Sequence, residues 1–147
     1  MSRFRSLTLL MVSFAGQLSG QTVAGDTAFQ RSIKLDIPDA SGFAFATLTV
    51  PTGKRLIIRY LTVTATLPSG QRFTSSVQAS LRGEVAEFPQ AYIWQSNDDG
   101  TDELVSGHLV MIQAEGDSTV YFQVFRRIPK GGVRVVFALS GDLVPAI

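Results

Sequence analysis

Apolar and polar residues alternate along most of the chain from residue 28 onward. The clearest run extends from Arg72 to Arg82, where every second residue from Phe73 to Leu81 is apolar or small and the residues between them are polar. Similar alternation covers residues 29–37, 61–67 and 133–140. A side-chain period of two is typical of a strand with one face in a core and the other in solvent. The pattern therefore predicts β-structure.

Clusters of Pro, Gly, Asp and Ser separate the alternating runs, for example at residues 38–42, 51–53, 68–70 and 129–132. No segment keeps the 3.6-residue period of an amphipathic helix for long. Regular short strands with turns between them favour a sandwich. We therefore predict an all-β chain, an antiparallel β-sandwich of jelly-roll-like form. Its strands, about eight in number, are expected near residues 28–37, 43–50, 54–66, 72–82, 91–95, 104–114, 119–127 and 133–144.

The predicted strand 54–66 changes its apolar face midway. Leu56 and Ile58 occupy even positions, whereas Leu61 and Val63 occupy odd ones. Because successive side chains of a strand point to opposite faces, a regular strand could not bury all four. A β-bulge, or a strand that bends from one sheet to the other, would explain the change.

An outer-membrane barrel is the rival architecture for alternating strands after an export signal. Such barrels carry aromatic girdles at both membrane interfaces and alternate short turns with long loops. This chain has one Trp, three Tyr and ten Phe spread along its length, and its turn signals are similarly short throughout. The pattern favours the sandwich.

The N-terminus has the organisation of a secretory signal peptide. Arg3 and Arg5 precede an apolar run over residues 7–16, which is shorter than the roughly 20 residues needed to span a bilayer. Residues 13–15 fit a small-residue cleavage site, and so do residues 23–25. A first buried strand or an interfacial helix is the alternative interpretation of the same run.

The domain organisation follows from that signal. We predict a signal peptide over residues 1–15, with cleavage as late as residue 25, a flexible N-terminal segment over 16–27 and the β-sandwich over 28–147. The chain has no Cys for a lipoprotein anchor and no second apolar run of membrane-spanning length. We therefore expect a secreted or periplasmic protein without a membrane span in its mature form.

Composition narrows the function classes. The 147 residues carry 13 basic and 12 acidic side chains, a net charge of +1. Removal of residues 1–15 takes away two arginines and leaves 11 basic against 12 acidic side chains, a net charge of −1. Such a chain lacks the basic excess that nucleic-acid binding needs. Without Cys there is no disulfide, thiolate metal site or cysteine nucleophile.

Two segments resemble a family of small secreted bacterial proteins of uncharacterised function. Residues 50–58 have the form Val-Pro-x-Gly-Lys-Arg-Leu-x-Ile, and residues 140–144 have the form Ser-Gly-x-Leu-Val. The resemblance extends over about residues 43–144, and these two ends are its distinctive parts. It implies a β-sandwich and export, and it implies no catalytic residues.

An acidic stretch over residues 97–103 is the most polar local feature. It contains the carboxylates of Asp98, Asp99, Asp102 and Glu103, which are the residue types that Ca²⁺ prefers. The spacing differs from that of an EF-hand loop, and Asx-rich segments with Gly are also ordinary hairpin loops. A calcium site at these four residues is therefore a hypothesis beside the interpretation as a solvated loop.

An aromatic segment precedes the acidic one. Tyr92 and Trp94 share one side of a predicted strand, with Ile93 on the other. If Ile93 belongs to the core, Tyr92 and Trp94 are exposed together and could bind a sugar ring or a protein partner. The alternative is that Trp94 fills the core, since Trp is highly buried on average.

The remaining polar groups give weaker signals. His108 is the only His, so a multi-histidine metal site is excluded, and no motif places a Ser nucleophile beside it. Two basic groups could converge on an anion or could be solvated charge at strand edges. They consist of Lys54, Arg55 and Arg59, and of Arg126, Arg127, Lys130 and Arg134.

These observations predict an exported, non-catalytic β-sandwich that binds a glycan, an envelope component or a protein partner, with no cofactor beyond the calcium hypothesis. Self-assembly through sandwich edges is a lesser alternative. The enzymatic alternative is a carboxylate-dependent, glycoside-active enzyme that would use Glu84, Glu87 and Glu103. Its acid and base would have to lie about 5–10 Å apart.

Overall fold

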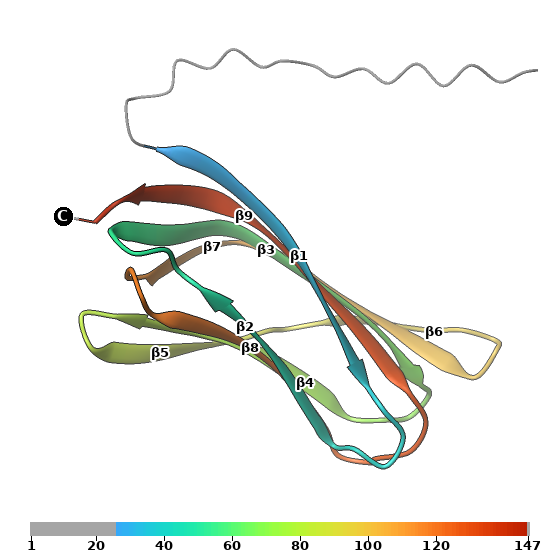
Figure 1. Cartoon of the computed structure of the whole chain (residues 1–147). Coiled ribbons are helices and arrows are strands. Elements are labelled where there is room, and N and C mark those ends of the chain that lie inside the picture. The colour runs from blue at the N-terminus through green and yellow to red at the C-terminus, as the bar shows by residue number, and fades with distance from the viewer. Residues whose placement is uncertain (1–25, 147) are drawn as a thin grey trace, which may run out of the picture.

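The computed structural model describes residues 26–146 of the chain, which form nine strands and no helix in two packed layers (Figure 1). The predicted signal peptide lies outside the described residues. The strands are β1 (Thr27–Ile37), β2 (Phe43–Thr49), β3 (Lys54–Pro68), β4 (Phe73–Leu81), β5 (Glu84–Pro89), β6 (Ile93–Ser96), β7 (Thr101–Ala114), β8 (Thr119–Arg126) and β9 (Val133–Pro145).

The strands form two antiparallel sheets. Sheet A has the order β1-β9-β3-β7-β6, and sheet B has the order β2-β8-β4-β5. Apart from the short β6, the pairing is nested: β4 pairs with β5, β3 with β7, β2 with β8 and β1 with β9. Nested pairs split between two sheets are the arrangement of a jelly roll. The predicted antiparallel β-sandwich is therefore confirmed.

The core lies between the sheets and follows the alternation in the sequence. In β4 the side chains of Phe73, Ser75, Val77 and Ala79 are buried, as the period of two predicts. Phe122 of β8 packs edge-on against Phe137 of β9, with ring centroids 5.3 Å apart. The inner faces of both sheets supply this apolar core, so the outward positions of each strand are left to face solvent.

Strand β5 was not predicted, because residues 83–90 were expected to connect the strands near 72–82 and 91–95. Arg82 and Gly83 form a two-residue hairpin turn between β4 and β5, with φ values of 56° and 77°. Positive φ at both central residues is the geometry that joins adjacent antiparallel strands most tightly. The Gly in that turn was the available signal, but β5 is mostly exposed and has no strong apolar alternation.

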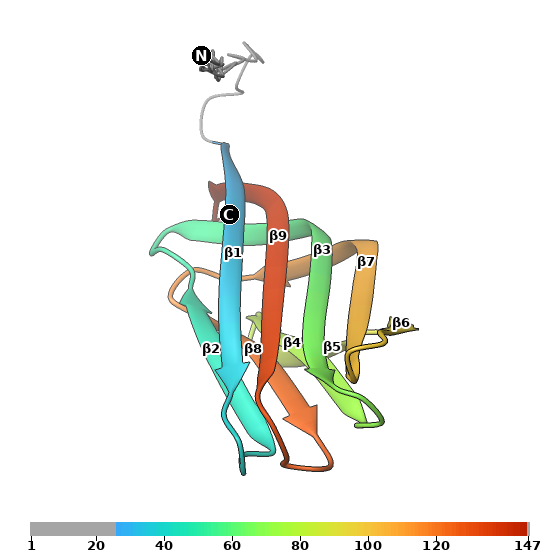
Figure 2. The same ribbon diagram turned by 90° about the vertical axis from the view of Figure 1, so that its right-hand side faces the viewer.

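The predicted irregularity in β3 is confirmed as a β-bulge at Arg59. Ile58 lies opposite Gly141 of β9 and Tyr60 lies opposite Ser140, so Arg59 has no partner on β9. Figure 2 shows β3, β7 and β9 turning sharply in this region. A Cβ atom at Gly141 would lie 1.9 Å from the Ile57 carbonyl oxygen. The bend therefore requires glycine at this position of β9.

The two segments that carry the family resemblance pair with each other in the sheet. Lys54 to Ile58 of β3 lie opposite Pro145 to Gly141 of β9. An ion pair between Arg59 and Asp142, with Nε and Oδ2 2.6 Å apart, joins the same two strands. The two distinctive segments, which lie far apart in the sequence, thus form one local structure at the bend of sheet A.

Arg126 closes the opposite end of the sandwich. Its guanidinium is 5% exposed and donates hydrogen bonds only to backbone carbonyls. Its Nε donates to Ser41 at 2.7 Å and its Nη2 to Pro38 at 2.6 Å, while Nη1 donates to Lys130 and Gly131. These acceptors belong to the two loops that cross between the sheets, β1–β2 and β8–β9. Arg126 therefore joins the layers.

Candidate functional site

The predicted pair Tyr92 and Trp94 does not form one exposed platform. Tyr92 is half-buried, packs edge-on against Phe73 at 5.6 Å and bonds Ser75 through its hydroxyl. Burial raises the pKa of its phenol to about 12, although the bond to Ser75 opposes that shift. Tyr92 fastens the segment that crosses from β5 in sheet B to β6 in sheet A.

Trp94 is exposed, but not for the reason that the sequence suggested. Ile93, which an exposed pair of Tyr92 and Trp94 would require in the core, is 78% exposed, and Trp94 is 45% exposed. Trp94 lies opposite the buried Leu104 and therefore takes the inner side of sheet A. It remains half open because β6 is a short edge strand that projects from the sandwich (Figure 1).

The four acidic residues of the proposed calcium site do not converge. Asp102 is buried, and its two oxygens accept hydrogen bonds from the Ser69 hydroxyl at 2.8 Å and from the Gly70 amide at 3.1 Å. The Ser69 bond is the largest cause of a lowered pKa at Asp102. This carboxylate stabilises the turn between β3 and β4.

The other carboxylates of the loop are separately placed. Asp99 accepts two hydrogen bonds from Thr101, whose hydroxyl is the main cause of a lowered Asp99 pKa. Asp98 is exposed at the turn, and Glu103 lies on the outer face of sheet A, opposite Thr66. Within residues 26–146, no group of three or more His, Asp and Glu side chains is placed to hold a metal ion.

The three glutamates of the enzymatic alternative lie on three different surfaces. Glu84 and Glu87 are three residues apart in β5, so they point to opposite sides of sheet B. Glu103 points outward from sheet A. The acid and base of a glycosidase must flank one bond, which these positions do not allow.

His108 lies on the inner side of β7, while Leu109 is 85% exposed on the outer side. Its Nε2 is 2.9 Å from Gln90 Oε1 and 3.2 Å from Ser106 Oγ. A nitrogen that donates to an amide oxygen cannot also take a proton from Ser106, so the serine is not activated as a nucleophile.

Neither basic group forms an anion site as a unit. Arg59 is paired with Asp142, and Arg134 is paired with Asp36 at 3.1 Å. Arg126 is buried among carbonyls, whereas its neighbour Arg127 is exposed. The basic group of residues 126–134 is thus split, with Arg126 buried at the end of the core and Arg127 on the surface.

The outer face of sheet A carries a depression that the sequence analysis did not identify. Ser32, Ala138, Thr62 and Gly107 lie opposite one another on β1, β9, β3 and β7, so four small side chains form a row across the strands. Tyr60, which is 43% exposed, stands in the next row. We call this row and its tyrosine wall the Tyr60 trough.

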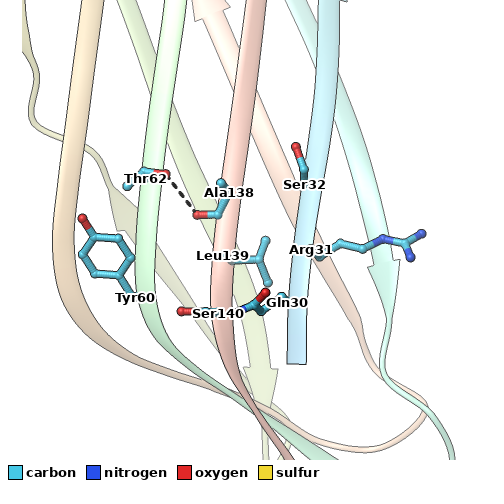
Figure 3. Close-up of a pocket in the computed structure, with 8 residues that line it drawn as sticks. All are labelled: Gln30, Arg31, Ser32, Tyr60, Thr62, Ala138, Leu139 and Ser140. Atoms are coloured by element: carbon cyan, nitrogen blue, oxygen red, sulfur yellow. Dashed lines mark hydrogen bonds between the residues drawn. The ribbon is translucent and has the colours of Figure 1, made fainter. Parts of the chain in front are cut away.

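The part of the trough over β1, β9 and β3 forms a pocket of about 400 Å³ (Figure 3). Tyr60 stands on one side and Gln30 on the other, with Ala138 and Ser140 between them. The pocket is lined by Gln30, Arg31, Ser32, Tyr60, Thr62, Ala138, Leu139 and Ser140. Its volume lies within the range of about 300–1,000 Å³ that is usual for small-molecule sites.

The lining groups are hydroxyls, an amide and one aromatic ring. Thr62 Oγ1 donates to the Ala138 carbonyl at 3.3 Å, which leaves its lone pairs available to a ligand. Arg31 contributes to the wall, but its guanidinium points away from the other lining residues in Figure 3. No carboxylate lines this pocket, so it has no acid–base pair for hydrolysis.

Gly107 lies beyond the pocket, at the end of the row, and makes room for the Tyr60 and Thr62 side chains. A Cβ atom there would lie 3.2 Å from the Thr62 methyl carbon and 3.3 Å from the Tyr60 hydroxyl oxygen. A glycine inside a strand often marks a close approach to the backbone, and this was the available signal in the sequence. The row itself depends on the register of four strands, which the sequence alone did not provide.

The fold defines the protein as an antiparallel β-sandwich of jelly-roll topology. No protein-family model matches the chain, and a search of curated proteins finds no match either. Its function is therefore argued from its own residues.

Proposed function

We propose that the protein is an exported, non-catalytic binding module that holds a neutral glycan in the Tyr60 trough. The observation that carries the proposal is the row of small residues beside Tyr60, which leaves room for a ring-sized ligand on the outer face of sheet A. The basic n-region and apolar run at the N-terminus support export.

The chemistry of the trough supports a sugar. A sugar ring has hydroxyl groups around its rim and C–H groups on its faces. The Ser32 and Ser140 hydroxyls and the Gln30 amide can donate to or accept from such hydroxyls, and the exposed Tyr60 ring offers an apolar surface. The pocket has no charged group turned into it, which favours a neutral ligand.

The proposal is tested by titrating a panel of neutral oligosaccharides and polysaccharides into the protein by calorimetry. Tyr60→Ala is expected to weaken binding at least tenfold, because it removes the wall of the trough. Ala138→Leu is expected to do the same by filling the floor. Ile93→Ala is the control, since Ile93 is an exposed apolar residue, at 78%, on the edge strand β6 and outside the pocket.

Binding that survives both Tyr60→Ala and Ala138→Leu, or that is lost equally in Ile93→Ala, would contradict the assignment. Absence of binding to every glycan in the panel at millimolar concentration would contradict the function. Export is tested separately, by fractionating a bacterium that expresses the full chain and measuring the mass of the recovered protein. We expect that mass to correspond to a chain that begins at residue 16 or residue 26.

A further inference from the structure

We propose that the outer face of sheet B docks a second copy of the chain. This face contains an aromatic cluster, here called the phenylalanine face, made of Phe43, Phe45, Phe125 and Tyr121. The four side chains are 41%, 55%, 42% and 38% exposed. The Phe43 ring lies 4.7 Å from that of Phe125 and 5.7 Å from that of Phe45, measured between centroids.

Contiguity distinguishes this cluster from scattered exposed residues. Phe43 lies directly opposite Phe125 across the β2–β8 pair. On the same face, Phe45 lies in the next row, opposite Gln123, and Tyr121 lies in the row after that, opposite Thr47. Single exposed apolar residues are ordinary on a protein surface, but a packed patch marks an interaction site. Phenyl rings also lack the polar handle that Tyr or Trp can offer to a sugar, so a second apolar surface suits them better.

The charge pattern points to an identical partner. The outward residues of β2, β8, β4 and β5 include one charged side chain, Glu87, which lies on the edge strand β5. Of the others, Val85 and Pro89 lie on β5, and the rest are aromatic or carry hydroxyls and amides, as in the 3.4 Å hydrogen bond from Gln123 to Gln78. A two-fold interface brings the same surface together twice, so any charge near its centre would meet its own copy. Arg72 and Arg127 are exposed just beyond the ends of β4 and β8, so the charge-free part of the face is confined to the strands. The aromatic part lies within it and can meet its own copy without like charges at its centre.

Its shape also suits sheet-on-sheet packing. Stacked sheets lie about 10 Å apart, which long Lys or Arg side chains between them would prevent. The four strands of sheet B, about 4.8 Å apart, and the eight residues of β8, about 3.4 Å each, give a face on the order of 500 Å² before side-chain relief. A standard interface takes about 800 Å² of accessible surface from each partner. We therefore expect a weak dimer with a Kd on the order of micromolar that uses the whole face.

The experiment measures association by sedimentation equilibrium over about 1–500 μM. The full chain is expressed in a bacterium, and the protein is studied in the processed form that the cell yields. We expect a reversible monomer–dimer equilibrium. Phe45→Ser should weaken it at least tenfold, and Thr47→Lys should do the same by placing like charges across the two-fold axis. Thr64→Lys is the matched control, because Thr64 is an exposed threonine on the outer face of sheet A.

Leu109→Ser examines the other exposed apolar region, on sheet A, and is expected to leave association unchanged. Circular dichroism reports whether each variant is folded, and Thr47→Lys keeps all four aromatic rings should Phe45→Ser unfold. A monomer at every concentration overturns the proposal. A dimer that Leu109→Ser abolishes and Thr47→Lys leaves intact also overturns the proposal. So does a monomer that binds polysaccharide and loses this binding in Phe45→Ser. Phe45 and Thr47 lie on sheet B and the Tyr60 trough lies on sheet A, so a loss of association in Phe45→Ser or Thr47→Lys does not depend on the trough.

Discussion

The outer faces of the two sheets differ although the same alternation builds both. On sheet A the outward positions include Lys34, Asp36, Arg134 and Glu103, of which Asp36 and Arg134 form an ion pair. On sheet B the outward positions carry the phenylalanine face and uncharged polar groups. Charged side chains solvate the β1–β9 side of the first surface, whereas its β7 side exposes apolar residues such as Leu109. The mutually packed phenyl rings of the second surface favour a covering partner.

Backbone shape separates the sheets as well. Both glycines that lie inside strands, Gly107 and Gly141, belong to sheet A. Gly141 permits the bend opposite the Arg59 bulge, and Gly107 makes room for the Tyr60 and Thr62 side chains. The strands of sheet B contain no glycine. Sheet A is therefore bent and grooved, whereas every position along the strands of sheet B carries a side chain.

The largest effect is expected from Gly141→Ala. The new methyl group would meet the Ile57 carbonyl oxygen, which is backbone and cannot turn aside. We expect a loss of about 3 kcal/mol or more in the free energy of unfolding, measured by urea denaturation. Gly132→Ala is the control, because nothing lies within 4 Å of its Cβ position. Equal stability of the two variants would show that sheet A does not need its bend.

A smaller loss of stability is expected from Arg126→Met, which changes the end of the sandwich where the two sheets are joined. The substitution keeps the apolar stem but leaves buried carbonyls of both crossing loops without donors. The expected loss is about 2–3 kcal/mol in the free energy of unfolding. Arg127→Met, at an exposed neighbouring position, should stay within about 0.5 kcal/mol of the wild type. Equal losses in both variants would contradict the role given to Arg126.

The smallest effect concerns Tyr92, on the segment that crosses between the sheets. Tyr92→Phe removes the bond to Ser75 and should cost about 1 kcal/mol in unfolding free energy at neutral pH. Burial raises the Tyr92 pKa from 10.0 to about 12, so folding favours the neutral phenol. Its contribution is complete below about pH 10 and is lost as the pH rises through about 12. An ultraviolet titration should show a late-ionising phenol that Tyr92→Phe lacks; its absence in the wild type would contradict the burial argument.

Much of the fold followed from periodicity in the sequence. The alternation in β4 and the change of apolar face between Ile58 and Leu61 predicted a buried strand side and a bulge, and both are confirmed. Strand β5 was missed because its side chains are mostly exposed and its hairpin turn places Arg82, rather than Asn or Asp, at positive φ.

The candidate site was less predictable. A period of two defines which residues share a face but not which face is buried. The sequence therefore left open whether Ile93 or Trp94 faces the core, and in the structure Ile93 points outward. Asp102 was a candidate calcium ligand because the sequence does not reveal its hydrogen bond to Ser69, which lies 33 residues away. The Tyr60 trough required the register of four strands, and that register is a property of the assembled sheet.

The nested pairing of the strands has a consequence for the time course of folding. The last strand in the sequence, β9, lies between β1 and β3 in sheet A. During synthesis β1 has no neighbour in that sheet until nearly the whole chain has been made, and such distant pairings form slowly. Until then the earlier strands cannot complete sheet A. A chain with this topology therefore cannot complete sheet A before the residues of β9 have been made.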